Sequence, residues 1–483
     1  MAGKTFDDLR AYIDAARELG KVCEIEGADW NEEIGALVEA AAELIPDPPL
    51  ILFDKIKGYP AGFRVVSLPM ASPKLAGLAL GLDIEGKSTA ELRELAQKKM
   101  SNIPRIPPVE VSTGPVMENV MKGDDIDLFR FPVPRFHAAD GGRYLGTGDC
   151  LVNRDPESGY INVGTFRMQL HEKNLLGLWI SPGKQGRQIC QRYWDRGEAC
   201  PIVATYGQDL LLFMASSSFS RWGECEIDKA GGLRGRPVEV IKGPLTGLPI
   251  PARAEIAIEG EVPPPSVEAR DEGPFGEWPG YYSGGTIGTG EKQPVIHVKA
   301  VYYRNNPIIH DSAPLWPGAI KYGLNYHTGK DRLEKAGIQD VVAVGSPMQY
   351  MQVISIRQRY AGHAKQAALA AASGTYNGRW IVVVDEDIDP YNLKEVLWAM
   401  TTRCDPARDI EIIDGCWSTP LDPLVSSDPA KREPNTQTNS LALYYATRPF
   451  NLKDKFPKVS RSPADLRQKV VDKYRGVLPF PSV

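Results

Sequence analysis

The stretch ARAEIAIEGEV, residues 252–262, decides how the middle of the chain is interpreted. Apolar and polar residues alternate along most of it. An alternation with a period of two predicts a β-strand and indicates that one of its faces is buried. Similar short runs, broken by Gly and Pro turns, extend from about residue 110 to residue 310 with few helix-like pieces between them. We therefore expect a barrel-like β domain in this region.

The N-terminal part contains sequence patterns that are typical of helices. Its apolar spacing predicts helices over residues 5–20, 31–45 and 88–100. The second helix is expected to be capped by Asn31, and the third by a capping box that starts at Ser88. A short strand pattern lies between them, so this part is predicted to be an α/β region.

The C-terminal part alternates between helix and strand patterns, which predicts a parallel sheet covered by helices. These patterns occupy residues 364–374, 379–392, 393–403 and 409–415. The predicted fold is therefore a multidomain α+β and α/β protein. Its expected divisions are an N-terminal α/β domain over residues 1–110, a split β-barrel over 111–315, a C-terminal α/β domain over 316–460 and a terminal helix over 461–483.

Composition argues against several classes of function. The 483 residues carry a net charge of −5 and no basic stripe, so we expect no nucleic-acid partner. The longest apolar runs are too short to span a membrane, and the N-terminus is a charged amphipathic pattern, not a signal peptide. Seven dispersed cysteines without CxxC pairs are typical of reduced thiols. These features predict a cytoplasmic protein.

The stretch RDEGPFGEWPGYY, residues 270–282, places Glu272 and Glu277 in a loop rich in Gly and Pro, beside aromatic residues. One interpretation is a rigid, half-apolar loop that directs two carboxylates into a pocket. The other is a tight surface turn with two ordinary charges. Taken alone, the stretch favours the surface turn, because functional carboxylates are much rarer than exposed ones.

Two further stretches hold candidate site residues. In YINVGTFR, residues 160–167, odd spacing puts Asn162 and Arg167 on opposite faces of a regular strand, although a bulge at Gly164 could bring both toward one site. In WGECEIDKAGGLRG, residues 222–235, Glu226 and Asp228 are expected to share one face of a strand. The alternative for each stretch is a pair of ordinary polar side chains at the surface.

Taken together, the motifs resemble the UbiD-type decarboxylases, which use prenylated FMN. The resemblance extends over nearly the whole chain and rests on six segments in the same order: residues 131–148, 154–167, 226–243, 251–261, 272–282 and 383–406. It implies an N-terminal α/β region, a central split β-barrel related to flavin reductases and a C-terminal α/β domain. It also implies a homodimer or homohexamer, in which the last helix reaches a partner subunit.

The resemblance assigns a metal site beside the cofactor phosphate. Asn162 and Glu226 match metal ligands, and the metal is manganese or magnesium, with iron(II) as a further candidate and a potassium ion nearby. Gln185, in SPGKQGR at residues 181–187, stands where the family usually has a third ligand, a histidine. Its amide oxygen suits a hard metal but supplies no imidazole, so metal binding depends on this position. His171 is expected to have a structural or supporting role.

The resemblance also assigns the reaction. Arg167 and Glu272 are expected to pair beside the cofactor and the substrate carboxylate, while the substrate forms a covalent adduct with prenylated FMN. Glu277 is expected to protonate the carbon left by CO2, and partial desolvation beside Trp278 is expected to raise its pKa. The reaction is reversible decarboxylation of an aromatic or heteroaromatic acid or an aryl-CoA thioester.

The remaining expectations concern the substrate pocket and the partners. Trp278, Tyr281, Tyr282 and residues 312–329 are candidates to line the pocket, the last as a lid. A flavin prenyltransferase is the expected supplier of the cofactor. Two alternatives stay open from the sequence: a flavin-binding protein without decarboxylase activity, such as a cofactor carrier or assembly subunit, and a simple FMN reductase.

Overall fold

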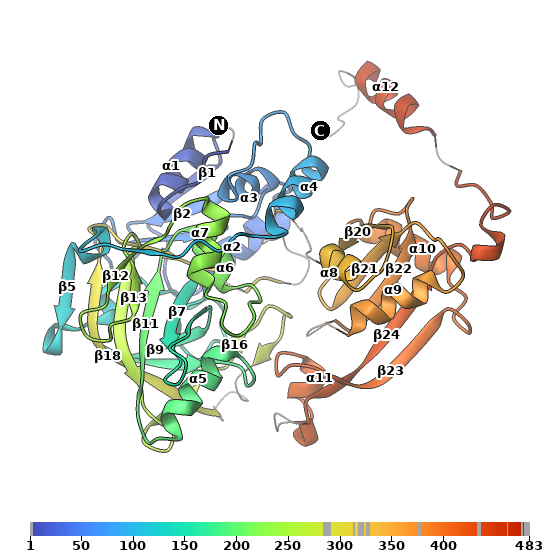
Figure 1. The fold of residues 1–483 in the computed structure, drawn as a ribbon. Helices are drawn as coiled ribbons and strands as arrows, with labels where there is room; N and C mark the ends of the chain where they lie inside the picture. The colour runs from blue at the N-terminus through green and yellow to red at the C-terminus, as the bar shows by residue number, and fades with distance from the viewer. Residues whose placement is uncertain are drawn as a thin grey trace. The chain divides into compact units, whose positions relative to one another are not determined.

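The computed structural model describes residues 3–283, 291–312, 314–316, 323–324, 329–373, 378–431, 436–460, 462–474 and 477. The chain divides into two compact units (Figure 1). The first contains residues 1–328, 348–350 and 414–440, and the second contains residues 329–347, 351–413 and 441–483. The domain boundaries expected at residues 110, 315 and 460 stay predictions.

A small sheet organises the N-terminal part. Its strand order is β1-β2-β3-β19, in which β2 and β3 are antiparallel and the two outer pairs are parallel. The strands are β1 (Val22–Glu26), β2 (Leu50–Asp54), β3 (Arg64–Ser67) and β19 (Ile308–His310), and the helices are α1 (Leu9–Glu18), α2 (Glu33–Leu44), α3 (Pro73–Ala79) and α4 (Thr89–Met100).

The predicted N-terminal helices are confirmed, but one cap is wrong. Ser88 and Glu91 form both bonds of the capping box of α4. Asn31 does not cap α2, because the helix starts two residues later, with Glu32 at the N-cap position and no side-chain cap. Asn31 instead pairs its backbone with Arg135 in an isolated bridge.

Ten strands form the central sheet. Their paired order is β6-β9-β10-β18-β14-β11-β7-β8, and β5 and β15 pair with β18. The strands are β5 (Asn119–Lys122), β6 (Arg143–Gly146), β7 (Asp149–Arg154), β8 (Ile161–Gly164), β9 (Arg167–Glu172), β10 (Leu175–Trp179), β11 (Cys200–Tyr206), β14 (Ile256–Val262), β15 (Ala269–Glu272) and β18 (Glu291–Tyr303).

The central sheet curls so that its ends approach each other. Strand β8 lies at one end of the paired order and β9 next to the other end, yet only Thr165 and Phe166 connect them. Two connecting residues span roughly 10 Å at most. The barrel-like β domain expected from the sequence therefore corresponds to a strongly curved sheet. Its kinship with flavin reductases stays a prediction.

Strand β14, within residues 252–262, is buried on both faces. Ile256, Ile258 and Val262 belong to one hydrophobic cluster, whereas Ala257 belongs to another. The strand prediction is confirmed. The two faces of the strand, however, pack into two different hydrophobic clusters, so neither face is exposed to solvent. Glu255 and Glu259, both 0% exposed, accept hydrogen bonds within the protein.

Three helices accompany the central sheet: α5 (Gln185–Trp194), α6 (Leu210–Ser216) and α7 (Glu226–Arg234), and α6 packs beside α7 (Figure 1). The strand predicted around Glu226 and Asp228 is wrong, because both lie in the first turn of α7. Carboxylates there complement the free N–H groups of a helix start, and Gly235, at φ 80°, ends the helix in a left-handed conformation.

Smaller elements complete this part of the chain. Strands β13 (Pro249–Pro251), β12 (Glu239–Lys242) and β4 (Val109–Glu110) form a three-stranded sheet, β16 (Phe275–Gly276) pairs with β17 (Tyr282–Ser283), and α11 spans Pro423–Ser426. The segment 312–329, proposed as a lid, lies mostly outside the described residues.

The predicted C-terminal α/β pattern is confirmed. The sheet has the order β20-β21-β22-β24-β23; β21, β22 and β24 are parallel, and β20 is antiparallel to β21. Its strands are β20 (Val341–Gly345), β21 (Met351–Ile356), β22 (Trp380–Asp385), β23 (Ile410–Trp417) and β24 (Thr438–Ala446), and the helices are α8 (Gly329–Lys335), α9 (His363–Ala372), α10 (Leu393–Arg403) and the terminal α12 (Ala464–Tyr474).

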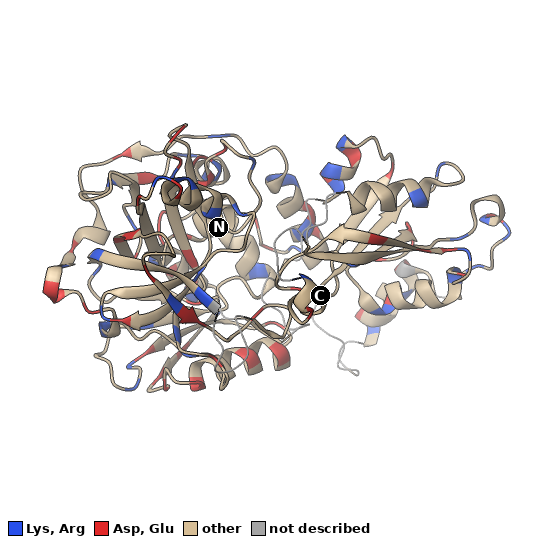
Figure 2. Ribbon diagram, turned by 90° about the horizontal axis from the view of Figure 1, so that it is seen from below, with Lys and Arg blue, Asp and Glu red and all other residues tan. Residues whose placement is uncertain are grey.

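Charge is mixed over the molecule, and the thiols are free. Figure 2 shows Lys and Arg interspersed with Asp and Glu along the ribbon. All seven cysteines are free. Within the described ranges, none of the helices combines the length and the apolar character that crossing a bilayer requires.

Candidate active site

Arg167 brings the two glutamates of the loop together. Its Nε and Nη2 donate to the two carboxylate oxygens of Glu272, at 2.7 and 2.5 Å. Its Nη1 donates to Glu277 Oε1 at 2.5 Å and to the Ser283 hydroxyl at 3.0 Å. Arg167 is the first residue of β9 and Glu272 the last of β15, so two strands of one sheet hold the bidentate pair. The predicted pairing of Arg167 with Glu272 is present.

The Arg167 cluster is almost completely removed from solvent. The exposed fractions of the Arg167, Glu272 and Glu277 side chains are 5%, 0% and 13%. Burial alone would lower the pKa of Arg167, but attraction to Glu272 and Glu277 raises it overall. Burial and the nearby Glu272 raise the pKa of Glu277, and Arg167 opposes that increase. The expected direction for Glu277 is therefore confirmed, with burial as its main cause.

The Gly and Pro residues of the loop form a tight hairpin. Glu277 directly follows β16, its backbone N–H donates to Tyr281 O, and the Gly280 N–H donates back to Glu277 O. Gly280 has φ 86°, a conformation that favours glycine. Phe275 is buried and packs on Tyr144 with ring centroids 4.2 Å apart, and the Arg167 guanidinium lies 5.1 Å from the centre of the Phe275 ring. The loop is therefore fixed by backbone hydrogen bonds and aromatic packing, and it positions the two carboxylates inside the protein instead of forming an exposed surface turn.

A distant segment anchors this loop. Asp140, buried, accepts the Gly276 N–H through Oδ1 at 3.0 Å and the His137 N–H through Oδ2 at 2.9 Å. Gly141 donates to Pro274 O at 2.7 Å, and a side chain at Gly141 would collide with the Gly273 carbonyl, because its Cβ would lie 2.0 Å from that oxygen. This anchoring role was not predicted from the sequence, although residues 137–141 belong to a segment that carries the family resemblance.

Asn162 and Arg167 lie on two strands, contrary to the expectation of one run with a bulge. Asn162 is in β8 and Arg167 starts β9, with a turn at Thr165 and Phe166 between them. Asp149, completely buried, accepts the Phe166 N–H at 3.2 Å, and the Thr165 hydroxyl donates to the Asp149 carbonyl. Burial raises the pKa of Asp149 to about 8.

The Glu226 carboxylate reaches the backbone of β8, the strand that carries Asn162. The Val163 N–H donates to Glu226 Oε2 at 2.8 Å, so the carboxylate sits beside the neighbour of Asn162. The Asn162 amide donates to Asn153 Oδ1 at 3.1 Å. Glu226 is 3% exposed, and burial raises its pKa to about 7 despite the backbone hydrogen bond.

Gln185 is held by protein groups at both ends of its amide. Its Oε1 accepts the Tyr160 hydroxyl at 2.8 Å, and its Nε2 donates to Ser220 O at 2.9 Å. Both polar atoms of the amide are therefore bound to protein. No group of three or more His, Cys, Asp or Glu with metal-binding geometry occurs in the described part of the chain. Asn162 and Glu226 offer oxygen ligands, and Gln185 Oε1 keeps a second lone pair beside the one that accepts the Tyr160 hydroxyl. The metal site with these three ligands stays a prediction.

The other candidate residues take supporting positions. His171, on β9, has a pKa lowered by burial. Trp278 is half-buried and packs on Tyr350 with ring centroids 5.5 Å apart, while the Gln349 amide donates to Trp278 O. Tyr281 and Tyr282 are 62% and 45% exposed. The aromatic character expected for a pocket wall is therefore divided between a packed Trp278 and two exposed tyrosines.

Comparison with known families gives a consistent match. Models of the 3-octaprenyl-4-hydroxybenzoate carboxy-lyases match the chain in three parts: the N-terminal domain over residues 13–99, the Rift-related domain over 108–317 and the C-terminal domain over 329–434. A phenolic acid decarboxylase from Streptomyces sp. (strain D7) is 31% identical over 425 residues, which are 84% of this chain and 86% of the relative. The pyrrole-2-carboxylic acid decarboxylase of Pseudomonas aeruginosa is 31% identical over 433 residues, with shares of 83% and 84%.

Solved structures agree with this match. The UbiD-class enzyme HmfF from Pelotomaculum thermopropionicum, in complex with FMN, superposes with a TM-score of 0.81 at 28% identity, covering 95% of this chain and 98% of that enzyme. An evolved dimeric form of HmfF, in complex with prFMN, superposes with a TM-score of 0.78 at 27% identity and the same shares.

Proposed function

The chain belongs to the UbiD family of carboxy-lyases, and on that premise we propose that it decarboxylates an aromatic or heteroaromatic carboxylic acid with prenylated FMN as cofactor. The observation that carries the proposal is the buried Arg167 held between Glu272 and Glu277. Curated relatives act on phenolic acids and pyrrole-2-carboxylic acid, and related structures contain FMN or prFMN. These findings support the substrate class and the cofactor.

Arg167, Glu272 and Glu277 have different proposed roles in the reaction. When bound, prenylated FMN supplies an electrophilic ring that accepts the electrons released with CO2. Arg167 attracts the substrate carboxylate, and the bidentate bond to Glu272 fixes the orientation of its guanidinium. Glu277 is held by a single guanidinium nitrogen, and its raised pKa favours the protonated form. It then delivers a proton to the carbon that has lost CO2.

The cofactor is proposed to lie along β8 and β9. Asn162 and Arg167 project from these consecutive strands, and Glu226 approaches from α7, so amide, guanidinium and carboxylate groups are available within one curved sheet. The Asn162 amide can donate to a flavin phosphate, whereas the Glu226 carboxylate would hold that phosphate only through a shared cation. A split barrel related to flavin reductases, cofactor supply by a flavin prenyltransferase, and assembly as a homodimer or homohexamer belong to the same proposal. The divalent and potassium ions remain to be tested by metal analysis.

The test is production of the protein together with a flavin prenyltransferase, followed by an absorption spectrum, an intact mass of the bound cofactor and a screen for CO2 release. We expect prenylated FMN and turnover of at least one phenolic or pyrrole carboxylic acid or aryl-CoA thioester. Bound cofactor with no turnover of any aromatic acid would support the alternative of a flavin-binding protein without decarboxylase activity. Plain FMN with nicotinamide oxidation would favour a reductase.

A further inference from the structure

Gln169 lies on β9, two residues after Arg167, so the two side chains point to the same face of the sheet. Its side chain is polar, yet the residue is only 5% exposed. Its Oε1 accepts the backbone N–H of Gly273 at 3.0 Å, and its Nε2 donates to Gly141 O at 3.1 Å. One buried side chain therefore joins the strand that carries Arg167 to two segments that are far away in the sequence.

Gly273, the first partner of Gln169, directly follows Glu272 in the chain. Glu272 ends β15 and forms the bidentate pair with Arg167, at 2.7 and 2.5 Å. The chain turns at Gly273, which has φ 87°. The hydrogen bond to Gln169 therefore fixes the backbone directly after the residue whose carboxylate holds the guanidinium.

The surroundings of Gln169 determine which way its amide faces. The Gly141 carbonyl can only accept and the Gly273 N–H can only donate, so the nitrogen and the oxygen of the amide each have one permitted place. Space is restricted as well, because a Cβ added at Gly142 would lie 2.6 Å from Gln169 Nε2. A side chain of the same length without the amide would keep the packing and lose both hydrogen bonds.

The charge state of Glu277 depends on where Glu272 lies. Burial raises the pKa of Glu277, Arg167 opposes this increase, and the nearby Glu272 adds to it. If Glu272 moved away from Arg167, the guanidinium would pair more closely with Glu277 and would lower the pKa of Glu277. The other ionisable groups around this loop, among the described residues, are Tyr144 of β6 and, in the anchoring segment, His137 and Asp140.

We propose that Gln169 is a positioning residue for the decarboxylation, which holds Glu272 in its bidentate pair with Arg167. This pairing leaves Glu277 available as the proton donor. The proposal rests on the proposed function, because the reaction and the roles of these three charged residues come from there. Gln169 acts through the backbone: its hydrogen bond fixes the residue after Glu272, and Glu272 in turn fixes the guanidinium.

The test compares Gln169→Met with the wild type, both produced with a flavin prenyltransferase and assayed on the phenolic or pyrrole carboxylic acid from which the wild type releases CO2. At neutral pH, kcat should fall by about 10-fold or more. The basic limb of the kcat profile should move to lower pH by about one unit, the lower end of the effect of an arginine on a neighbouring carboxylate. The cofactor spectrum should be unchanged, and hydrogen exchange of residues 270–277 should increase even in the apoprotein.

Gln358→Met is the matched control. Gln358 is 7% exposed, belongs to the second compact unit and donates through Nε2 to Asp385 Oδ1 at 2.7 Å and to Arg448 O at 2.9 Å. Its replacement should lower stability and leave the basic limb in place. Gln169→Asn keeps a buried amide that is too short to reach both segments. It should move the limb in the same direction as Gln169→Met, so the test does not depend on the folding of one variant.

The outcomes distinguish this proposal from the function on which it rests. An active wild type with an unchanged basic limb in folded Gln169→Met would overturn the role of Gln169 and leave the proposed function intact. An equal loss of kcat at every pH, matched by Gln358→Met, would also overturn it, because Gln169 would then contribute stability alone. A wild type that binds prenylated FMN and releases CO2 from none of the aromatic acids would overturn both. Melting curves establish that each variant is folded.

Discussion

Arg167 gives the two glutamates different environments, and this difference can be tested one residue at a time. Glu277→Gln keeps a polar side chain beside Arg167 but removes the transferable proton. If Glu277 is the proton donor, kcat should fall by about 10²- to 10⁴-fold while the bound cofactor remains unchanged. Turnover assays with a flavin absorption spectrum provide the measurement. Near-normal turnover would remove Glu277 from the chemistry.

The pH dependence of kcat tests the protonation state of the same residue. Burial raises the pKa of Glu277, so its folded-state pKa lies above that of a free glutamate. A general acid works while protonated, and kcat should therefore decrease as the pH rises through this raised pKa. The basic limb should lie at a higher pH than an ordinary glutamate would give, and it should be missing in Glu277→Gln. The same limb in both proteins would assign it to another group.

At the scale of elements, the glutamate loop depends on a segment that is far away in sequence. Asp140 holds Gly276 across a separation of 136 residues. Asp140→Ala should let the loop shift and lower kcat by about 10- to 100-fold, because misplacement by 1 Å has effects of that order. KM and flavin content should change little. Steady-state kinetics and hydrogen exchange of the peptide containing Glu277 provide the measurements.

Glu259→Gln is the matched control for the Asp140 prediction. Glu259 is also completely buried, and it accepts backbone N–H groups of another loop, at Leu245 and Thr246. We expect it to reduce stability without a selective loss of kcat. If Asp140→Ala and Glu259→Gln change kcat and the melting temperature in the same proportion, Asp140 has no special role in positioning the loop.

These elements also show what the sequence could and could not predict. Periodicity and capping signals located most helices and strands, and motif resemblance selected Arg167, Glu272 and Glu277, which the fold brings together. It could not place Asp140 beside the site, because the partner of Asp140, Gly276, lies in a segment that is distant in the sequence. The prediction of a strand at Glu226 was wrong because an acidic pair two residues apart occurs in the first turn of a helix as well as on one face of a strand.

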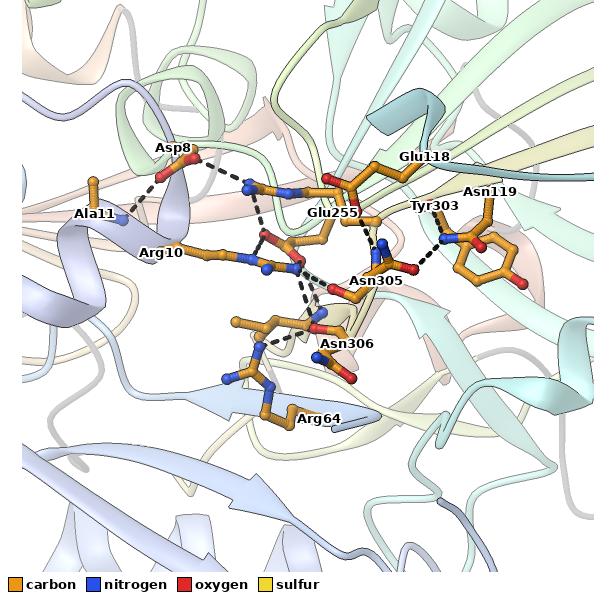
Figure 3. Close-up of polar contacts among 12 residues, drawn as sticks. Asp8, Arg10, Ala11, Arg64, Glu118, Asn119, Glu255, Tyr303, Asn305 and Asn306 are labelled. Atoms are coloured by element: carbon orange, nitrogen blue, oxygen red, sulfur yellow. Dashed lines mark hydrogen bonds and ion pairs between the residues drawn. The ribbon is translucent and has the colours of Figure 1, made fainter. Parts of the chain in front are cut away.

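At the scale of the whole molecule, Glu255 joins the N-terminal region to the central sheet (Figure 3). Its carboxylate, 0% exposed, accepts Arg10 Nε and Nη2 at 2.8 and 2.7 Å and Arg304 Nη1 at 3.2 Å. It also accepts the backbone N–H of Ile308, where β19 begins. One buried carboxylate therefore connects α1, the end of β18 and the start of β19, which completes the N-terminal sheet.

Glu255→Ala should destabilise the fold more than any loss of a surface ion pair. It would leave Arg10 without an anion and Arg304 with Asp8 only, and breaking a buried ion pair costs up to about 3–5 kcal/mol. Arg17→Ala, on the same helix, removes exposed pairs with Asp14 and Glu24 and should cost less than about 1 kcal/mol. Denaturant unfolding with hydrogen exchange at β19 provides the measurement. Equal effects of the two variants would show that the first unit does not depend on the Glu255 connection, and β19 would then be held by its pairing with β3 and by the core packing of Ile308 and Ile309.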